Sequence, residues 1–162
     1  MSRDHEISKK PRVRSAKLED CQVIARNMRE EDRLELFHSS RSTPLDALKR
    51  GFESSEICKV IIYDGEPIAM FGIVRDIHAP EVGIPWMLAT PEIVKIRKSF
   101  LRKAGEELKK LSFGFRVLSN MVWGANSIHI LWLRWLGFTV QADRPVIRSG
   151  SVFYPFWRSV DV

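Results

Sequence analysis

A chain of 162 residues fits one domain, and 44% hydrophobic with 28% charged residues is typical of a globular protein with a full core. The net charge of +6 favours an anionic partner, although an ordinary basic surface explains it equally well. No apolar run reaches the roughly 18 residues of a membrane span, and the polar N-terminus has no signal-peptide core. Cys21 and Cys58 lie far apart without metal-ligand spacing, which predicts reduced thiols, a cytosolic protein and no metal site.

The first half of the chain predicts a short strand, helices and a hairpin after a polar, basic segment over residues 1–11 that we expect to be flexible. Thr43 followed by Pro44 indicates a helix start. Asp64-Gly65 between two β-branched runs is the strongest hairpin signal in the chain. The expected elements, in order, are a strand (13–17), a helix (18–28), a further helical segment (30–37), a helix (45–52) and two strands (57–63 and 66–74).

The second half predicts alternating strands and helices. Apolar residues at helical spacing predict one buried stripe on each helix: Ile93, Ile96, Phe100, Ala104, Leu108 and Leu111 on the first, and Ile128, Leu131, Trp132, Trp135 and Leu136 on the second. Gly137 predicts the end of the second helix. The expected elements are a strand (83–89), a long helix (91–111), a strand (115–123), a helix of about three turns after Asn126, and two strands (138–141 and 151–157).

A strand, a helix that begins at Asn126, the sequence Leu-Gly-Phe and another strand closely resemble the ending of the GNAT (Gcn5-related N-acetyltransferase) fold. The element order resembles that family from end to end. The resemblance implies an α/β (α+β) fold, a central mixed, twisted sheet of about six to seven strands with helices on both faces, in one domain over residues 12–162. The strands before Thr90 and before Asn126 are then expected to be parallel neighbours that diverge at their C-terminal ends.

GNAT enzymes hold the pyrophosphate of acetyl-CoA on the pattern Q/R-x-x-G-x-G/A at the start of the long helix, where glycines let phosphate approach the backbone. Here Val94, Arg97 and Ser99 occupy those three places, so we expect weak or no acetyl-CoA binding. A cofactor that did bind would be held, by resemblance, on Leu88, Ala89, Thr90, Lys95, Arg97, Lys98 and Asn126. A solvated basic helix face and a simple N-cap explain the charged residues and Asn126 without any cofactor.

The family's general acid is also missing. Many GNAT enzymes carry a Tyr seven residues after the helix-start Asn, and this chain has Leu133 there. His129 lies on the same helix, where an imidazole could act as acid or base near neutral pH. His78 and Glu81 precede the central strand, where the family often places a base or a substrate-contacting carboxylate. Structural or solvent-exposed roles explain all three residues as well.

One GNAT-like group departs from the pattern in a similar way. The chain resembles the internal virion protein A group of short-tailed phages through Trp86 to Thr90, Phe100 to Arg102, Asn120 to Trp123 and Asn126 to Ile130. That resemblance implies a phage protein made in the host cytoplasm and associated with virion assembly or with the virion itself.

Three hypotheses remain open, and whether the chain is an enzyme is undecided among them. The first is a GNAT-fold protein that acts by protein contacts in phage assembly, which the missing glycines and Tyr favour. The second is an active N-acyltransferase that moves an acetyl group from acetyl-CoA to an amine of a host or phage target. The third is a nucleic-acid binder, which net charge alone supports.

Overall fold

The structure is a computed structural model, and it describes residues 10–160. The expected flexible N-terminus lies outside the described residues except for its last two positions. The helices are α1 (Asp20–Arg26), α2 (Glu30–Ser39), α3 (Pro44–Ser54), the 3₁₀ helix η1 (Pro91–Ile96), α4 (Arg97–Leu111) and α5 (Ser127–Trp135). The strands are β1 (Arg12–Ser15), β2 (Ser55–Tyr63), β3 (Glu66–Arg75), β4 (Val82–Ala89), β5 (Val117–Trp123), β6 (Thr139–Val140), β7 (Val146–Arg148) and β8 (Ser151–Ser159).

Local signals in the sequence act as predicted. The Thr43 hydroxyl accepts a hydrogen bond from the Asp46 N–H at 3.2 Å and caps α3. Asp64 and Gly65 both have positive φ, at 52° and 78°, which joins β2 to β3 in a tight hairpin whose twist suits the flanking strands. Gly137, with φ of 88°, ends α5.

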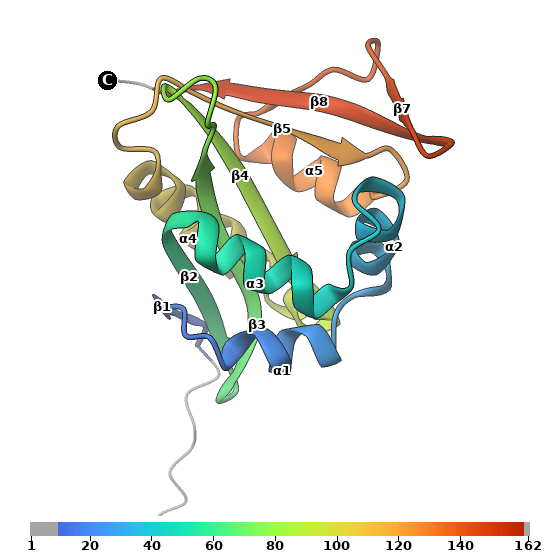
Figure 1. The fold of residues 1–162 in the computed structure, drawn as a ribbon. Coiled ribbons are helices and arrows are strands. Elements are labelled where there is room, and N and C mark those ends of the chain that lie inside the picture. The colour runs from blue at the N-terminus through green and yellow to red at the C-terminus, as the bar shows by residue number, and fades with distance from the viewer. Residues whose placement is uncertain (1–9, 161–162) are drawn as a thin grey trace, which may run out of the picture.

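All strands within residues 10–160 belong to one mixed, eight-stranded sheet in the order β1-β2-β3-β4-β5-β8-β6, with β7 paired to β8. Successive residues of β2 point to opposite faces, so Val60 joins a core beneath α1 and α3 while Ile61 joins a core beneath η1 and α4. A third core, around Leu118 and Phe156, lies beneath α5. Helices therefore cover both faces, as expected (Figure 1).

The predicted divergence of the two central strands is confirmed. β4 and β5 are parallel, and they pair only where they start, at Val82 with Val117 and at Gly83 with Leu118. Beyond that point they separate, and α2 lies across the open end of the gap (Figure 1). Each of the two strands stays paired on its other side: β4 pairs with β3, and β5 pairs with β8, along their lengths.

Three predictions about the elements were wrong. The sheet has eight strands rather than six or seven, because the three-residue strand β7 was missed. The long helix starts as the 3₁₀ helix η1, which suits Ile93 and Ile96, since buried residues three apart share one face at three residues per turn.

None of the helices within residues 10–160 has the length and apolarity that crossing a bilayer demands.

The third error concerns the buried face of α5. Its buried residues are Ile130, Trp132 and Leu133, whereas Ile128, Leu131 and Trp135 are exposed by 39%, 65% and 61%. Apolar residues surround this helix almost completely, so spacing alone did not choose the face. The sheet beneath α5 made that choice, and an apolar stripe remains on the surface.

Candidate active site

A cavity of about 680 Å³ begins in the gap between β4 and β5 and extends under α4. Its walls are mainly apolar and come from both faces of the sheet, through side chains that include Trp86, Leu88, Phe100, Ala104, Trp132 and Leu133. Two of its lining residues, Glu35 and His129, carry groups able to exchange protons near neutral pH. A concave apolar pocket with a few convergent polar groups is the usual form of a small-molecule site.

Helix α2 bridges the two diverging strands through its carboxylates. The Asp32 side chain accepts a hydrogen bond from the Ala89 N–H of β4 at 2.9 Å, and the Glu35 side chain accepts one from the Trp123 N–H of β5 at 2.8 Å. The Arg29 N–H also donates to the Ala89 carbonyl oxygen at 2.8 Å. Separated strands leave backbone groups that need other partners, and here side chains of α2 supply them.

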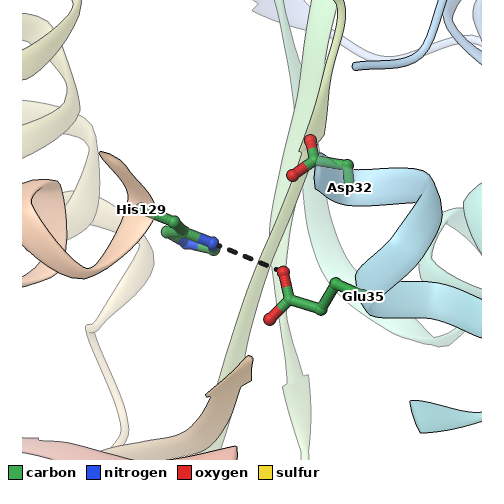
Figure 2. A group of neighbouring side chains, drawn as sticks. All are labelled: Asp32, Glu35 and His129. Carbon is green, nitrogen blue, oxygen red and sulfur yellow. Dashed lines mark ion pairs between the residues drawn. The ribbon is translucent and has the colours of Figure 1, made fainter. Parts of the chain in front are cut away.

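Glu35 and His129 face each other across the site, as Figure 2 shows. The Nδ1 atom of His129 lies 3.7 Å from Oε2 of Glu35, an ion-pair distance too long for a hydrogen bond. Burial would raise the pKa of Glu35, but His129, with the N–H groups of Trp123 and Asn126, lowers it below its ordinary value. Burial would lower the pKa of His129, but Glu35 and Asp32 raise it. The pair is therefore poised as carboxylate and imidazolium.

Asp32 and Arg29 form a second, deeper pair. Their side chains are 2% and 3% exposed, and Nη1 of Arg29 lies 3.3 Å from Oδ1 of Asp32. Burial raises the pKa of Asp32, and the charge of Arg29 opposes that rise. The Arg29 guanidinium also lies over the Trp132 ring, 5.6 Å from its centroid. Two acidic and two basic groups thus balance one another inside the protein.

Three of these residues carry the donor types of a metal site. One ligand atom each from Asp32, Glu35 and His129 lie within 4.8 Å of one another, close enough to share an ion. However, both carboxylates already accept backbone N–H groups, and Arg29 supplies the positive charge that a cation would bring. Because backbone N–H groups and Arg29 already interact with these carboxylates, we assign no metal to the group.

Several buried polar atoms around the two pairs have no hydrogen-bond partner among the described residues. They are Nη2 of Arg29, Oγ1 of Thr90, Oδ1 of Asn126 and Nδ1 of His129. Native proteins leave few such atoms, and each one calls for an explanation such as a catalytic role. Their gathering at one place indicates that this region is built for polar chemistry rather than for packing.

Asn126 has a different role from the N-cap that was the simple alternative. It is fully buried, makes no capping hydrogen bond, and donates from Nδ2 to Oε2 of Glu35 at 3.0 Å. The simple capping interpretation was therefore wrong. The amide nitrogen of Asn126 binds a carboxylate of α2, and its oxygen, the atom that would cap α5, accepts no hydrogen bond from the described residues. The role of Asn126 toward a cofactor stays a prediction.

The start of η1 does not fit a pyrophosphate bound on the backbone. Pro91 has no N–H, the Ile93 N–H donates to the Thr90 carbonyl oxygen at 3.2 Å, and the Arg97 N–H donates to that of Val94. Anion sites at helix starts need free N–H groups, and these two are occupied.

The other predicted cofactor residues are scattered around this segment. Lys95, Arg97 and Lys98 are exposed, and Lys95 pairs with Glu92 at 3.0 Å. Leu88 lines the cavity, and the N–H of Ala89 is taken by Asp32. The Lys95 side chain and the Ala89 N–H thus have protein partners, and the role of all these residues toward a cofactor stays a prediction.

His78 and Glu81 lie elsewhere. Both are exposed in the loop before β4, at the opposite end of that strand from Ala89, and the structure does not bring them to His129. Sequence reasoning missed Arg29, Asp32 and Glu35, to which it assigned no role. Carboxylates three residues apart on a helix share one face, and that spacing was the available signal.

By sequence, the chain matches no protein-family model and no curated protein. By structure it is similar to yncA of Salmonella typhimurium, a candidate acetyltransferase solved with acetyl-CoA, at TM-score 0.68 and 18% identity over 94% of this chain and 95% of that one. It is also similar to the diaminobutyrate acetyltransferase EctA of Paenibacillus lautus, solved with its substrate and coenzyme A, at TM-score 0.67 and 15% identity over 95% and 99%.

A third similar structure is the ribosomal-protein-S18-alanine N-acetyltransferase of Escherichia coli, at TM-score 0.62 and 14% identity over 94% of this chain and 95% of that one. Identities this low carry the fold and not the activity. The strand order, the diverging parallel pair and these similarities agree on one architecture. The chain has the GNAT acyl-CoA N-acyltransferase fold.

Proposed function

We propose that the chain is an N-acyltransferase that moves an acyl group from a thioester to an amine, with Glu35 and His129 as its proton-transfer pair. The observation that carries this proposal is the position of the pair in the wall of the cavity between the diverging strands. Buried charged groups are costly in a protein that only needs to fold, and perturbed pKa values beside a cavity are typical of active sites.

The chemistry needs only these two side chains and a positioned substrate. The amine nitrogen attacks the carbonyl carbon of the thioester, so a C–N bond forms and the C–S bond breaks. Protonated His129 gives its proton to the departing thiolate. The new amide nitrogen then releases its extra proton to the Glu35–His129 pair, which restores the imidazolium. One proton has moved from the amine to the thiol, and the missing Tyr is not required.

A thiol-release assay tests the proposal. Acyl-CoA donors of two to twelve carbons would be incubated with a panel of primary amines, and product amides identified by mass spectrometry. We expect His129→Ala to lower the transfer rate by about 10²–10⁴-fold, the usual contribution of a general acid or base. His78→Ala is the matched control and should retain the rate. Equal rates in wild type and His129→Ala would contradict the assignment.

A second candidate is a contact role in phage virion assembly, in which no acyl transfer occurs. The exposed apolar stripe of Ile128, Leu131 and Trp135 on α5 supports it, together with the occupied N–H groups of η1. Sedimentation of phage particles from cells that produce the chain provides the test. Co-sedimentation that Leu131→Lys abolishes would support this role, and absence of the chain from particles would contradict it.

A further inference from the structure

We infer that the cavity under α4 holds a long aliphatic acyl chain, so that the donor is a fatty acyl thioester rather than an acetyl thioester. The inference rests on the proposed acyl transfer and names its donor class. It is carried by the way α4 packs, by the chemistry of the cavity wall, and by the lack of a phosphate site at η1.

Helix α4 has few fully buried residues along its length. Of its fifteen described residues, only Phe100 and Leu111 are buried. Ala104 and Leu108 lie on the same stripe; they are partly buried against the core, as the sequence predicts, and they also line the cavity. An apolar stripe that borders a cavity leaves room for an apolar ligand.

The cavity combines one reactive place with a largely apolar wall. Glu35 and His129 mark the reactive place, where the strands diverge. The wall beneath α4 is made by aliphatic and aromatic side chains from the sheet, α4 and α5, among them Phe71, Met87, Leu108 and Leu133. Lys103 and Glu107 are the charged residues that α4 contributes, and Glu107 pairs with Lys110 at 3.4 Å. A molecule with a carbonyl at one end and a hydrocarbon tail fits this distribution.

Size separates a long chain from an acetyl group. The whole cavity, which also extends along α2 and α3 on the other face of the sheet, has a volume of about 680 Å³, within the range of sites that enclose whole ligands, roughly 300–1,000 Å³. An acetyl group is two carbons long, so most of the wall would have no contact partner and would lose its dispersion energy. A long chain fills the wall, and each buried methylene raises affinity by about fourfold.

This gain in affinity also replaces the missing phosphate site. Pro91 has no N–H, and the Ile93 and Arg97 N–H groups are occupied, so the nucleotide part of a CoA donor gains little from these positions. Burial of a hydrocarbon tail provides the binding free energy from the other end of the donor. Affinity should then depend on chain length much more than on the nucleotide.

Binding of fatty acids to the full chain tests the inference without requiring catalysis. Isothermal titration with hexanoate, octanoate, decanoate and dodecanoate should show affinity rising about fourfold per methylene until the cavity is full. Ala104→Phe places a ring in the cavity and should weaken dodecanoate binding by about tenfold or more. Lys109→Phe, on the exposed side of the same helix, is the matched control and should bind as wild type does.

Thermal unfolding checks that Ala104→Phe is folded, and Ala104→Leu replaces it if it is not. Fatty acid binding that the cavity variant weakens supports the inference even if no thioester is ever a substrate, in which case the proposed function alone fails. Transfer of acetyl and dodecanoyl groups at equal efficiency, with no fatty acid binding, overturns the inference and leaves the proposed function standing. Equal dodecanoate affinity in wild type and the folded cavity variant also overturns it.

Discussion

The segments that follow the two diverging strands differ in how their polar groups are used. After β4, the Ile93 N–H donates to the Thr90 carbonyl oxygen and the Arg97 N–H to that of Val94, and Ile93 and Ile96 are buried in the core. After β5, the side chains of Asn126 and His129 lie against Glu35, and each has a buried polar atom with no hydrogen-bond partner among the described residues. Both segments border the same gap in the sheet.

Under the proposed function, the difference separates the nucleotide side of the site from the proton-transfer side. An N–H group that already has a partner cannot receive a phosphate. Buried polar groups without hydrogen-bond partners are costly, which favours a chemical role for Asn126 and His129. The following predictions test this contrast, from the largest expected effect to the smallest.

Asp32→Ala should lower the free energy of unfolding by about 3–5 kcal/mol, because it removes the buried carboxylate partner of Arg29 and frees the Ala89 N–H. Chemical denaturation measures the loss. Glu31→Ala is the control, since its half-exposed carboxylate pairs with the same guanidinium at 3.6 Å and should cost at most about 1 kcal/mol. Similar losses in both variants would show that α2 is not fixed through its buried carboxylate.

Asn126→Ala should cost about 1.5–3 kcal/mol, the range for a hydrogen bond to a charged group. A lost N-cap would cost about 1 kcal/mol, so the size of the effect separates the two roles. Denaturation of the double variant with Glu35→Gln sharpens the test. The two losses should be less than additive if Asn126 acts through Glu35.

His129 should titrate above the ordinary histidine pKa of about 6.5, because Glu35 raises its pKa in the folded state. A raised pKa adds stability that is fully present below pH 6.5 and is lost as pH rises through the folded-state value. Wild type should therefore be favoured over His129→Gln more strongly at pH 5.5 than at pH 9. Histidine NMR titration and denaturation at both values check this, and a pKa below 6.5 would disprove the ion pair.

Acetyl-CoA should bind weakly or not at all in isothermal titration, and Arg97→Gly should not improve it. The Arg97 N–H already donates to the Val94 carbonyl oxygen, so removing the side chain frees no donor. A dissociation constant in the low micromolar range, about −8 kcal/mol, would show that side-chain charge at Lys95 and Lys98 replaces the missing glycines.

Much of the fold could be predicted, because its signals are local. The Asp64-Gly65 hairpin, the Thr43 cap and the Gly137 helix end each depend on backbone conformations that few residues allow. The parallel, diverging strand pair followed from the order of elements. The buried face of α5 could not be predicted, because apolar residues surround that helix.

Only part of the candidate site could be predicted from the sequence. His129 and Asn126 stood out on a short, well-defined helix, whereas Asp32 and Glu35 looked like an ordinary charged run. No local pattern distinguishes a carboxylate that will be exposed from one that will meet a backbone N–H of a strand 57 residues away. The partners of Asp32 and Glu35 depend on where β4 and β5 end in space.

The sequence by itself determined the order of helices and strands, the turn positions and the loss of the glycine pattern, since these depend on residue type and spacing. The tertiary structure decided which groups meet where the two strands diverge. Where the two parallel strands diverge, backbone N–H groups have no partner on the neighbouring strand, and carboxylates of α2 accept their hydrogen bonds. It also placed Ala104 and Leu108 of α4 at the wall of the apolar cavity. Such long-range contacts arise only when the chain has folded, because they join segments that no local pattern connects.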